Sequence, residues 1–264
     1  MLKGKITLIT GAGSGLGKDI AIGLASEGAE VILVGRREPM LKQTLEAIER
    51  EGGKAALYVT NVTDKDEVNI LAQHVLEKHG VPAMLVNSAG TYGEISTIAD
   101  SNPDIWIHTL MTNTAGSYLI CRAFVGAMVK EGWGRIVNIT SAASLSKPNP
   151  KNSAYAVSKA ALNLFTRQLA AEVQGTGVTA NVLHPGEVMT EMFDTIRATS
   201  ASSGDMTGWV QWVQQTGGDS PDKTVRRILD LTKPESSEIN GQFLWIKDGL
   251  KQPLPSWEVD DSLQ

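Results

Sequence analysis

The chain is poor in cysteine, and its single thiol limits the ways in which the fold can be held together. Cys121 is the only cysteine among 264 residues, so no disulfide can form within the chain. A reducing compartment is therefore expected, and we predict a cytoplasmic protein. Because Cys121 follows the apolar residues Leu119 and Ile120, we expect it to be a buried structural thiol.

Other absences remove further classes of protein. The formal net charge is −5, which gives no electrostatic reason to expect nucleic acid or an anionic membrane as a partner. No run is long and apolar enough to span a bilayer, and the first expected strand starts too close to Met1 to leave room for a signal peptide. The histidines do not cluster with metal-ligand spacing, so we expect no metal site.

What is present is an alternation of short apolar runs with helix-like segments. Most of the runs are continuously apolar, which is typical of strands in a parallel sheet that is covered on both faces. We expect strands at 5–10, 30–35, 55–60, 83–87, 135–140, 178–183 and 242–247, and helices at 16–26, 38–50, 65–78, 103–130, 154–174 and 221–232. The helix at 103–130 has a candidate break near Thr112. This order predicts a single α/β domain with a doubly wound parallel sheet of about seven strands and helices on both faces.

A glycine-rich turn joins the first expected strand to the first expected helix. Gly11, Gly15 and Gly17 follow the strand directly, with the spacing G-x-x-x-G-x-G rather than the broader G-x-G-x-x-G string. Glycines allow the backbone to turn tightly and to approach a pyrophosphate closely, and the following helix N-terminus offers free N–H groups. The turn therefore predicts a dinucleotide phosphate site.

Tyr155 and Lys159 are four residues apart in a segment that is expected to be helical. Positions i and i+4 share a helix face, so the phenol and the ammonium can point into the same space. A free phenol has a pKa near ~10, and a nearby cation lowers that pKa, which suits Tyr155 to general acid/base chemistry. Many helices carry such a pair by chance, and this one gains weight from the glycine turn.

Five motifs follow one another along the chain: Thr10-Gly11-x-x-x-Gly15-x-Gly17, Asn87-Ser88-Ala89-Gly90, Ser141, Tyr155-x-x-x-Lys159 and Pro185-Gly186. In this order and spacing the chain resembles the short-chain dehydrogenase/reductase family, from about residue 5 to residue 249. The resemblance implies a Rossmann-type domain over 1–250 that includes a substrate lid at about 190–220. A tail at 251–264 follows, as a partner-binding arm or a partly disordered end. The resemblance further implies an oxidoreductase that transfers hydride between a nicotinamide cofactor and a ketone, aldehyde or secondary alcohol.

The resemblance assigns four catalytic residues, of which three have one clear position. Tyr155 would exchange a proton with the substrate oxygen. Lys159 would lower the pKa of Tyr155 and hold the nicotinamide ribose. Asn113 matches the family asparagine that supports a water-linked proton relay to the lysine, and the alternative is a helix-kink residue without a chemical role.

Ser141 would hydrogen-bond the substrate oxygen and hold it as charge develops. Its separation from Tyr155 is one residue longer than is usual in the family, and Thr140 and Ser144 are neighbouring hydroxyls. The extra residue is placed most simply in the loop at 147–150, which leaves Ser141 as the first choice.

The end of the second expected strand indicates which cofactor is preferred. An NAD site places an acidic residue about 20 residues beyond the glycine turn, but this chain has Arg36 and Arg37 there. A guanidinium pairs with a phosphate, whereas a carboxylate would repel one. We therefore predict NADP(H) in preference to NAD(H), with Arg36 as the first 2′-phosphate ligand and Arg37 as the second. The alternative is that both arginines form a solvated helix start.

Further cofactor contacts are implied by position in the family. Ser14 stands where some members carry a base, and Asn61 stands where the family usually has an acid that positions adenine. Thr190 matches the threonine that lies near the nicotinamide carboxamide. The complete expected set is Gly11, Ser14, Gly15, Leu16, Gly17, Arg36, Arg37, Asn61, Val62, Asn87, Ala89, Gly90, Tyr155, Lys159, Pro185, Gly186, Val188 and Thr190.

The segment 191–220 stands where family members carry a substrate lid. Residues 199–205 are rich in Ser, Ala and Gly, and we expect them to be mobile. One apolar helical face is predicted by the spacing of Met206, Trp209, Val210 and Val213. This face either packs on the domain or, with Met192 and Phe193, shapes a pocket for a medium-sized, fairly apolar carbonyl compound or secondary alcohol.

Other functions compete with this one. A 3-oxoacyl-carrier-protein reductase needs a basic docking patch, and the turn at 174–177, where such members place a base, has none. A sugar epimerase or dehydratase usually has a different glycine spacing and a longer C-terminal domain. A non-catalytic NADPH-binding regulatory or scaffold protein would have a damaged catalytic group, whereas all four residues are intact.

Family members pair through helices equivalent to 103–130 and 154–174, so we expect a homodimer or homotetramer that acts on a small molecule.

Overall fold

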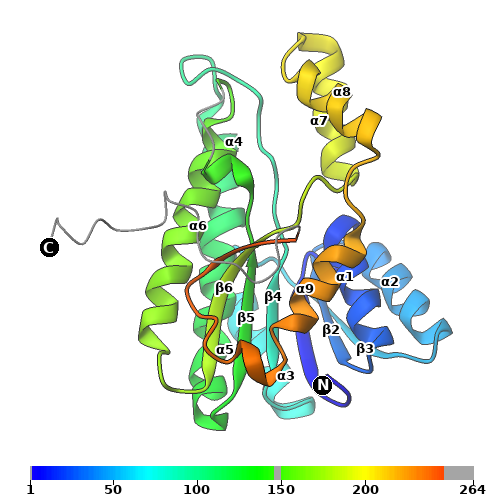
Figure 1. The fold of residues 1–264 in the computed structure, drawn as a ribbon, viewed down its shortest axis with the longest axis vertical. Coiled ribbons are helices and arrows are strands. Elements are labelled where there is room, and N and C mark those ends of the chain that lie inside the picture. Colours follow the sequence, from blue (N-terminus) through cyan, green and yellow to red (C-terminus); the bar gives the residue numbers. More distant parts are fainter. Residues whose placement is uncertain (1, 146–149, 247–264) are drawn as a thin grey trace, which may run out of the picture.

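The computed structural model describes residues 2–145 and 150–246, and the strands within them form one parallel sheet (Figure 1). Its strands are β1 (Ile6–Thr10), β2 (Glu30–Gly35), β3 (Lys54–Val59), β4 (Met84–Asn87), β5 (Gly134–Ile139), β6 (Val178–His184) and β7 (Phe243–Trp245). Their order is β3-β2-β1-β4-β5-β6-β7. The predicted doubly wound sheet and its seven strands are confirmed. Residue 247, the loop residues 147–149 and the tail at 251–264 lie outside the described part of the chain.

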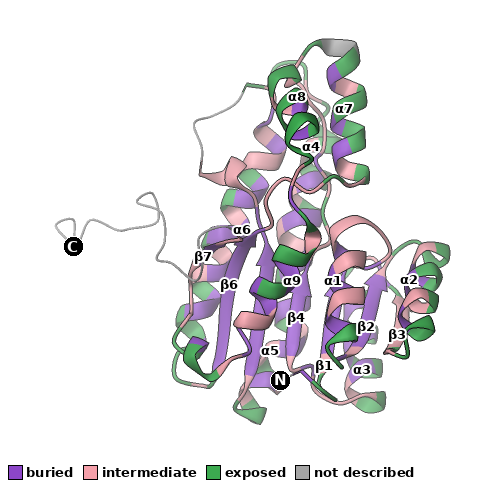
Figure 2. Cartoon of the chain, turned by 45° about the vertical axis from the view of Figure 1, so that its right-hand side comes forward, coloured by how far each residue is buried: buried purple, intermediate pink, exposed green. Residues whose placement is uncertain are grey.

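Helices cover both faces of this sheet. One face carries α1 (Gly15–Ser26), α2 (Glu38–Arg50) and α9 (Pro221–Asp230), and the other carries α3 (Lys65–Lys78), α5 (Gly116–Glu131) and α6 (Ser153–Glu172). Leu24 and Ile228 pack in the first core, and Leu71 and Phe124 pack in the second. The sheet between the two layers is buried along most of its length (Figure 2). Burial on two faces explains why the strands read as continuous apolar runs.

The expected break in the long helix is a change of helix type. Helix α4 (Pro103–Leu110) continues into a π-helical turn, η1 (Met111–Ala115), and then into α5 without a gap. A π-turn widens the helix by one residue, and such turns often lie at functional sites. Asn113 stands inside this turn and is fully buried.

Two helices of the segment where a substrate lid is expected, α7 (Glu191–Ser203) and α8 (Thr207–Thr216), stand beyond the carboxyl edge of the sheet (Figure 1). The segment 199–205, which we expect to be mobile, is helical for most of its length, because α7 continues to Ser203; its mobility stays a prediction. Gly204 ends the helix in the left-handed conformation, with φ of 75°. Serine and alanine are compatible with a helix, and the glycine serves as its C-terminal cap.

The topology decides where a ligand can enter. Strands β1 and β4 are neighbours, and the chain runs outward from this pair in opposite directions. At such a switch point the loops after the two strands turn away from each other and leave a crevice at the carboxyl edge. The glycine turn follows β1, and the segment 88–93 follows β4, so both border this crevice. Two short 3-10 turns, η2 (Ala142–Ser144) and η3 (Pro234–Ser236), complete the described elements.

Candidate active site

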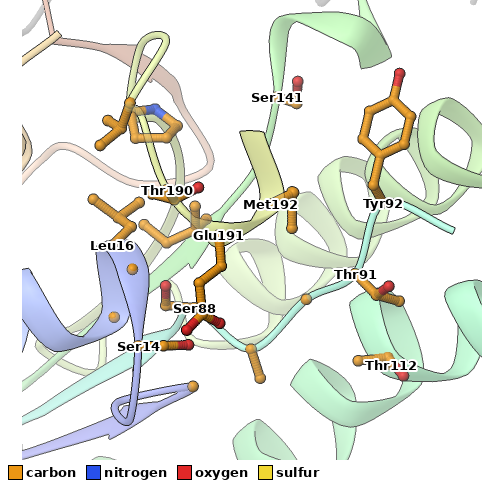
Figure 3. A pocket seen from close by; sticks show the side chains of 18 of the residues that line it. Ser14, Leu16, Ser88, Thr91, Tyr92, Thr112, Ser141, Thr190, Glu191 and Met192 are labelled. Atoms are coloured by element: carbon orange, nitrogen blue, oxygen red, sulfur yellow. The ribbon is translucent and has the colours of Figure 1, made fainter. Parts of the chain in front are cut away.

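A cavity of about 650 Å³ opens at the carboxyl edge of the sheet (Figure 3). The loops after β1 to β6 all contribute to its wall. Of the residues expected to bind cofactor or to act in catalysis, all except Asn87 and Asn113 line it. Positions spread over most of the sequence are thus brought to one cavity.

The glycine turn forms a close-fitting cradle at one end of this cavity. Gly11 has a φ of 69°, and a Cβ there would lie 2.9 Å from the backbone of Ala89. A Cβ on Gly17 would collide with the Gly11 carbonyl oxygen. Ser14 precedes α1 but makes no side-chain capping bond to it, so the first N–H groups of the helix remain open. The residues therefore fit a dinucleotide, whose phosphates need backbone N–H donors at close approach.

Tyr155 and Lys159 lie one turn apart on α6 at the cavity wall. The Lys159 Nζ lies 5.7 Å from the centre of the Tyr155 ring and donates a hydrogen bond to the Ile139 carbonyl at 2.8 Å. Burial lowers the pKa of Lys159 to about 8. The Tyr155 side chain is half-buried, and burial of its hydroxyl raises the pKa of the phenol to about 12. The hydrogen bond with Ser141 opposes this rise, and the charge of Glu187 adds to it.

The pKa of Tyr155 is raised overall in this geometry, and the expected lowering by Lys159 stays a prediction. Removal of water from the phenol is the largest cause of the rise. The ammonium is itself buried, and its hydrogen bond goes to a backbone carbonyl rather than to the phenol. At neutral pH this phenol carries its proton, which suits it to donate a proton to a carbonyl oxygen.

Among three neighbouring hydroxyls, Ser141 is the one that faces Tyr155. It follows β5, lines the cavity, and hydrogen-bonds the phenol. Its Oγ also accepts the Ala143 N–H at 3.2 Å. The Thr140 hydroxyl donates to Asn163 at 2.5 Å, and the Ser144 hydroxyl donates to the Ser141 carbonyl at 2.5 Å. The longer separation from Tyr155 has thus not displaced Ser141 from the site.

Asn113 lies behind the cavity wall. Its Oδ1 accepts the Thr91 N–H at 2.8 Å, and its Nδ2 donates to the Thr91 carbonyl and to the Ser158 Oγ, each at 2.9 Å. The amide therefore ties the segment after β4 to α6. Its part in a proton relay stays a prediction.

Asn87 also lies off the wall, and its expected contact with the cofactor stays a prediction. Side chains alternate between the faces of a strand, and that of Asn87 points under the wall. Its Nδ2 donates to the Asn138 Oδ1 at 2.8 Å and to the Cys121 Sγ at 3.4 Å. Cys121 is buried, as predicted, and burial raises the pKa of its thiol to about 12.

The two arginines after β2 both line the cavity, but they differ in their contacts. Arg37 Nη2 donates to the Ser14 Oγ at 2.7 Å and to the Glu191 Oε2 at 3.0 Å. Arg36 is exposed. The structure thus places Arg37, the second choice from the sequence, directly against the glycine turn.

Several residues of the wall were not found by sequence reasoning. Tyr92 stacks on Tyr155, and its hydroxyl donates to the Met206 Sδ at 3.1 Å. Asn152 is 6% exposed, and its Oδ1 has no hydrogen-bond partner within the described ranges. It precedes α6 as the N-cap residue but makes no capping bond. A search for N-cap residues could have found Asn152, whereas Tyr92 stands in an irregular segment that carries no periodic signal.

The lid supplies the apolar side of the cavity. Both Val210 and Val213 are buried in a cluster with Phe193, so the predicted face of α8 does pack. The cavity itself is bordered by Met192, Phe193, Ile196, Met206 and Trp209. Residues of this segment thus both pack together and border the cavity, and their part as a substrate lid stays a prediction.

Two structural features are absent from the residues that the structure describes. No helix between residues 2 and 246, outside the gap at 146–149, has the length and apolarity needed to cross a membrane. In the same ranges no group of His, Cys, Asp and Glu side chains could hold a metal ion.

Comparison with known proteins agrees with this geometry. A family model for short chain dehydrogenase matches residues 5–201. The 3-oxoacyl-[acyl-carrier-protein] reductase FabG of Thermotoga maritima is 31% identical over 249 residues, which cover 94% of this chain and 98% of that protein. A short chain dehydrogenase of Pseudocercospora fijiensis is 35% identical over 193 residues, and the match spans 72% of this chain but only 62% of that relative.

Solved structures give the same result. An actinorhodin polyketide ketoreductase with NADPH has a TM-score of 0.86 at 28% identity, covering 95% of this chain and 99% of that one. An NAD⁺-bound xylitol dehydrogenase has a TM-score of 0.85 at 25% identity, covering 93% and 98%. The chain belongs to the short-chain dehydrogenase/reductase family. It is accordingly an oxidoreductase with a nicotinamide-cofactor site.

Proposed function

We propose that the protein reduces a ketone or aldehyde with NADPH, and that it oxidises the corresponding alcohol in the reverse direction. The observation that carries this proposal is the meeting of Tyr155, Ser141 and Lys159 with the glycine cradle in one cavity. The high pKa of Tyr155 supports the reductive direction at neutral pH, because the phenol keeps the proton that a carbonyl oxygen needs.

Each residue of the group has a distinct part. Tyr155 donates the proton, and Ser141 holds the substrate oxygen by a hydrogen bond while negative charge develops on it. Lys159 holds the ribose hydroxyls next to the nicotinamide. Asn113 keeps the segment after β4 in place against α6 and supports proton supply to Lys159. The bound cofactor supplies the hydride. Replacement of Tyr155 by Phe should lower kcat by about 10²- to 10⁴-fold with little change in cofactor affinity.

The preference for NADPH rests on the two arginines. Relatives of this fold have been solved with NADPH and with NAD⁺, so membership of the family does not decide the cofactor. Arg36 and Arg37 place two guanidiniums at the cavity wall, where an acid would favour the ribose hydroxyl. The other residues expected to bind the cofactor would contact it as the family resemblance implies, either at the glycine turn or around the nicotinamide.

A paired fluorescence titration with NADPH and NADH tests this preference. We expect NADPH to bind at least about tenfold more tightly. Arg36→Asp and Arg37→Asp should each reverse or abolish the difference. Equal affinities in the wild type, or an unchanged ratio in both variants, would contradict the assignment. Failure to bind either cofactor would instead revive a non-catalytic function.

The substrate side supports a medium-sized compound that is mainly apolar. Lid residues such as Phe193 and Trp209 border it. The buried Oδ1 of Asn152 is the exception, because it has no hydrogen-bond partner among the residues that the structure describes, and such a polar atom is costly. Asn152 and Tyr155 lie three residues apart at the start of α6 and share a helix face. We infer that the substrate carries a second oxygen function, such as a hydroxyl, that meets this amide.

Reduction of 3-oxoacyl chains on a carrier protein is the second candidate. The name of the Thermotoga maritima relative favours it. The turn at 174–177 has no base, but Lys5, Arg135 and Lys233 line a second cavity beside it. A clear preference for an acetoacetyl group on carrier protein over the same group on a small thiol would support this function.

We further propose one catalytic domain over 1–250 with its lid at 190–220, a cytoplasmic location, and assembly into a homodimer or homotetramer. Exposed apolar side chains on three helices support assembly, among them Ile107 on α4, Tyr118 on α5 and Leu164 on α6. Light scattering during size-exclusion chromatography would give the mass in solution, and a monomer would contradict the expected assembly.

A further inference from the structure

Glu191 places a negative charge inside the end of the cavity that we assign to the cofactor. It is the first residue of α7, and its carboxylate extends toward Ser14 on the glycine turn (Figure 3). Its Oε2 accepts a hydrogen bond from the Arg37 Nη2 at 3.0 Å. Ser14 accepts a hydrogen bond from the same nitrogen at 2.7 Å and hydrogen-bonds the Glu191 carboxylate. One carboxylate therefore joins the lid, the glycine turn and the end of β2.

The surroundings of this carboxylate are those of an anion site. Helix α1 begins after Ser14 and α7 begins after Thr190, and both N-termini carry positive partial charge. The two starts are adjacent, because a Cβ on Gly15 would lie 3.2 Å from the Thr190 Cβ. Arg37 adds a full positive charge, and its hydrogen bond holds the pKa of Glu191 below its usual value. The Glu191 carboxylate thus lies where two helix N-termini and the Arg37 guanidinium would also attract another anion.

A cofactor phosphate would need the same donors. Arg37 and Ser14 cannot serve the carboxylate and a phosphate at full strength together, and two anions at this distance repel each other. Glu191 is more than half exposed, so its side chain can swing away into solvent. The ion pair is therefore weak enough to be exchanged.

We propose that Glu191 is an internal anion that a phosphate of the cofactor must displace, so that this residue lowers the affinity for the dinucleotide. The proposal rests on the proposed function, since it requires a cofactor in this cavity. The displacing group is the 2′-phosphate or the pyrophosphate, and the two are distinguished by the comparison of NADPH with NADH.

The test is a fluorescence titration of the wild type and of Glu191→Gln with each cofactor. Asp194→Asn is the matched control, since it makes the same chemical change on α7 but stands off the cavity wall and pairs with Arg197. We expect E191Q to bind NADPH about three- to tenfold more tightly and D194N to bind as the wild type does. A gain for NADPH alone would identify the 2′-phosphate, and a gain for both cofactors would identify the pyrophosphate.

Two outcomes would overturn the proposal. If the wild type binds cofactor but E191Q binds neither cofactor more tightly, Glu191 is not a competing anion, and the proposed function stands. If the wild type binds neither cofactor, the proposed function fails and this inference fails with it. The Arg37→Ala background gives a second check, because the gain from E191Q should shrink once no guanidinium holds the carboxylate. If E191Q increases cofactor affinity in the Arg37→Ala background as much as it does in the wild type, the ion pair with Arg37 does not hold the carboxylate in place.

Discussion

Tyr92 stacks on Tyr155 with the ring centroids 4.7 Å apart and the ring planes 28° from parallel. Tyr92 is 8% exposed and reaches Met206 at the start of α8 through its hydroxyl. The stack therefore covers one face of the proposed proton donor and joins it to the lid. It also contributes to the burial that raises the pKa of Tyr155.

Removal of this cover should move the pH dependence of the reaction. Tyr92→Ala admits water to the Tyr155 phenol, so its pKa should fall from about 12 toward its ordinary value. Alcohol oxidation needs the phenolate and rises with pH through this pKa, so the rise should shift to lower pH. Ketone reduction needs the protonated phenol, so its loss at high pH should also begin at lower pH. The profile of kcat/KM against pH measures both, with Tyr92→Phe, which keeps the stack, as the control. Superimposable profiles for Tyr92→Ala and the wild type would show that the stack does not control this pKa.

Lys159 should make the stability of the protein depend on pH in the alkaline range. Its pKa is about 8 in the folded chain and 10.5 as its ordinary value, so between these limits the unfolded chain binds more protons. Stability from this group therefore rises as pH increases from 8 to 10.5, and it is lost as pH falls through 8. The slope should approach about 1.4 kcal/mol per pH unit.

Lys159→Met should remove this slope. Urea unfolding at pH 8 and at pH 9.5 measures it, and the exposed Lys130→Met is the control that should keep the slope of the wild type. An equal slope in Lys159→Met and the wild type would assign the dependence to other groups.

Gly90 lies close to both Asn113 and Lys159. A Cβ there would lie 3.2 Å from the Asn113 Oδ1 and 3.7 Å from the Lys159 Nζ. Gly90→Ala should push these groups by a few tenths of an ångström and lower kcat by roughly ten- to a hundredfold, because catalysis depends steeply on position. Gly126→Ala on α5, where a Cβ would meet nothing within 4 Å, should leave kcat unchanged. Steady-state kinetics measure kcat, and thermal unfolding checks that the variant is folded. A Gly90→Ala variant with full activity would show that the space beside Gly90 is not needed for catalysis.

Replacement of Asn152 should raise the stability of the protein and weaken its preference for hydroxyketones. Asn152→Leu removes a buried polar atom that has no partner within residues 2–145 and 150–246, and it should raise the free energy of unfolding by about 1 kcal/mol. It should also lower kcat/KM for hydroxyketones by about tenfold relative to plain ketones. Thr179→Val removes another unpartnered buried atom away from this cavity, and it should stabilise without changing the preference. If Asn152→Leu leaves the ratio between the two ketone classes unchanged, the amide does not meet the substrate.

The fold and the cofactor cradle could be predicted because their signals are local. The glycine spacing from Gly11 to Gly17 requires neighbours only a few residues away, and the pair Tyr155 and Lys159 follows from one helical turn. Alternation of apolar runs with helical segments is enough to predict a parallel sheet with helices on both faces. Composition alone did not indicate that 199–203 belongs to a helix, where α7 continues.

Other properties depend on residues that are far apart in the chain. Arg37 and Glu191 meet although they are 154 positions apart, and no local pattern links them. Asn87 and Asn113 carry the expected residue types, but the pleat of β4 and the π-turn direct their amides to structural partners.

The sequence by itself determined the class of sheet, the glycine turn and the candidate proton donor, because short-range spacing and side-chain chemistry suffice for these. Only the tertiary structure decided which arginine meets the glycine turn, which carboxylate opposes it, and in which direction the pKa of Tyr155 moves. These three properties depend on burial and on through-space charge, and both arise only when distant segments pack together.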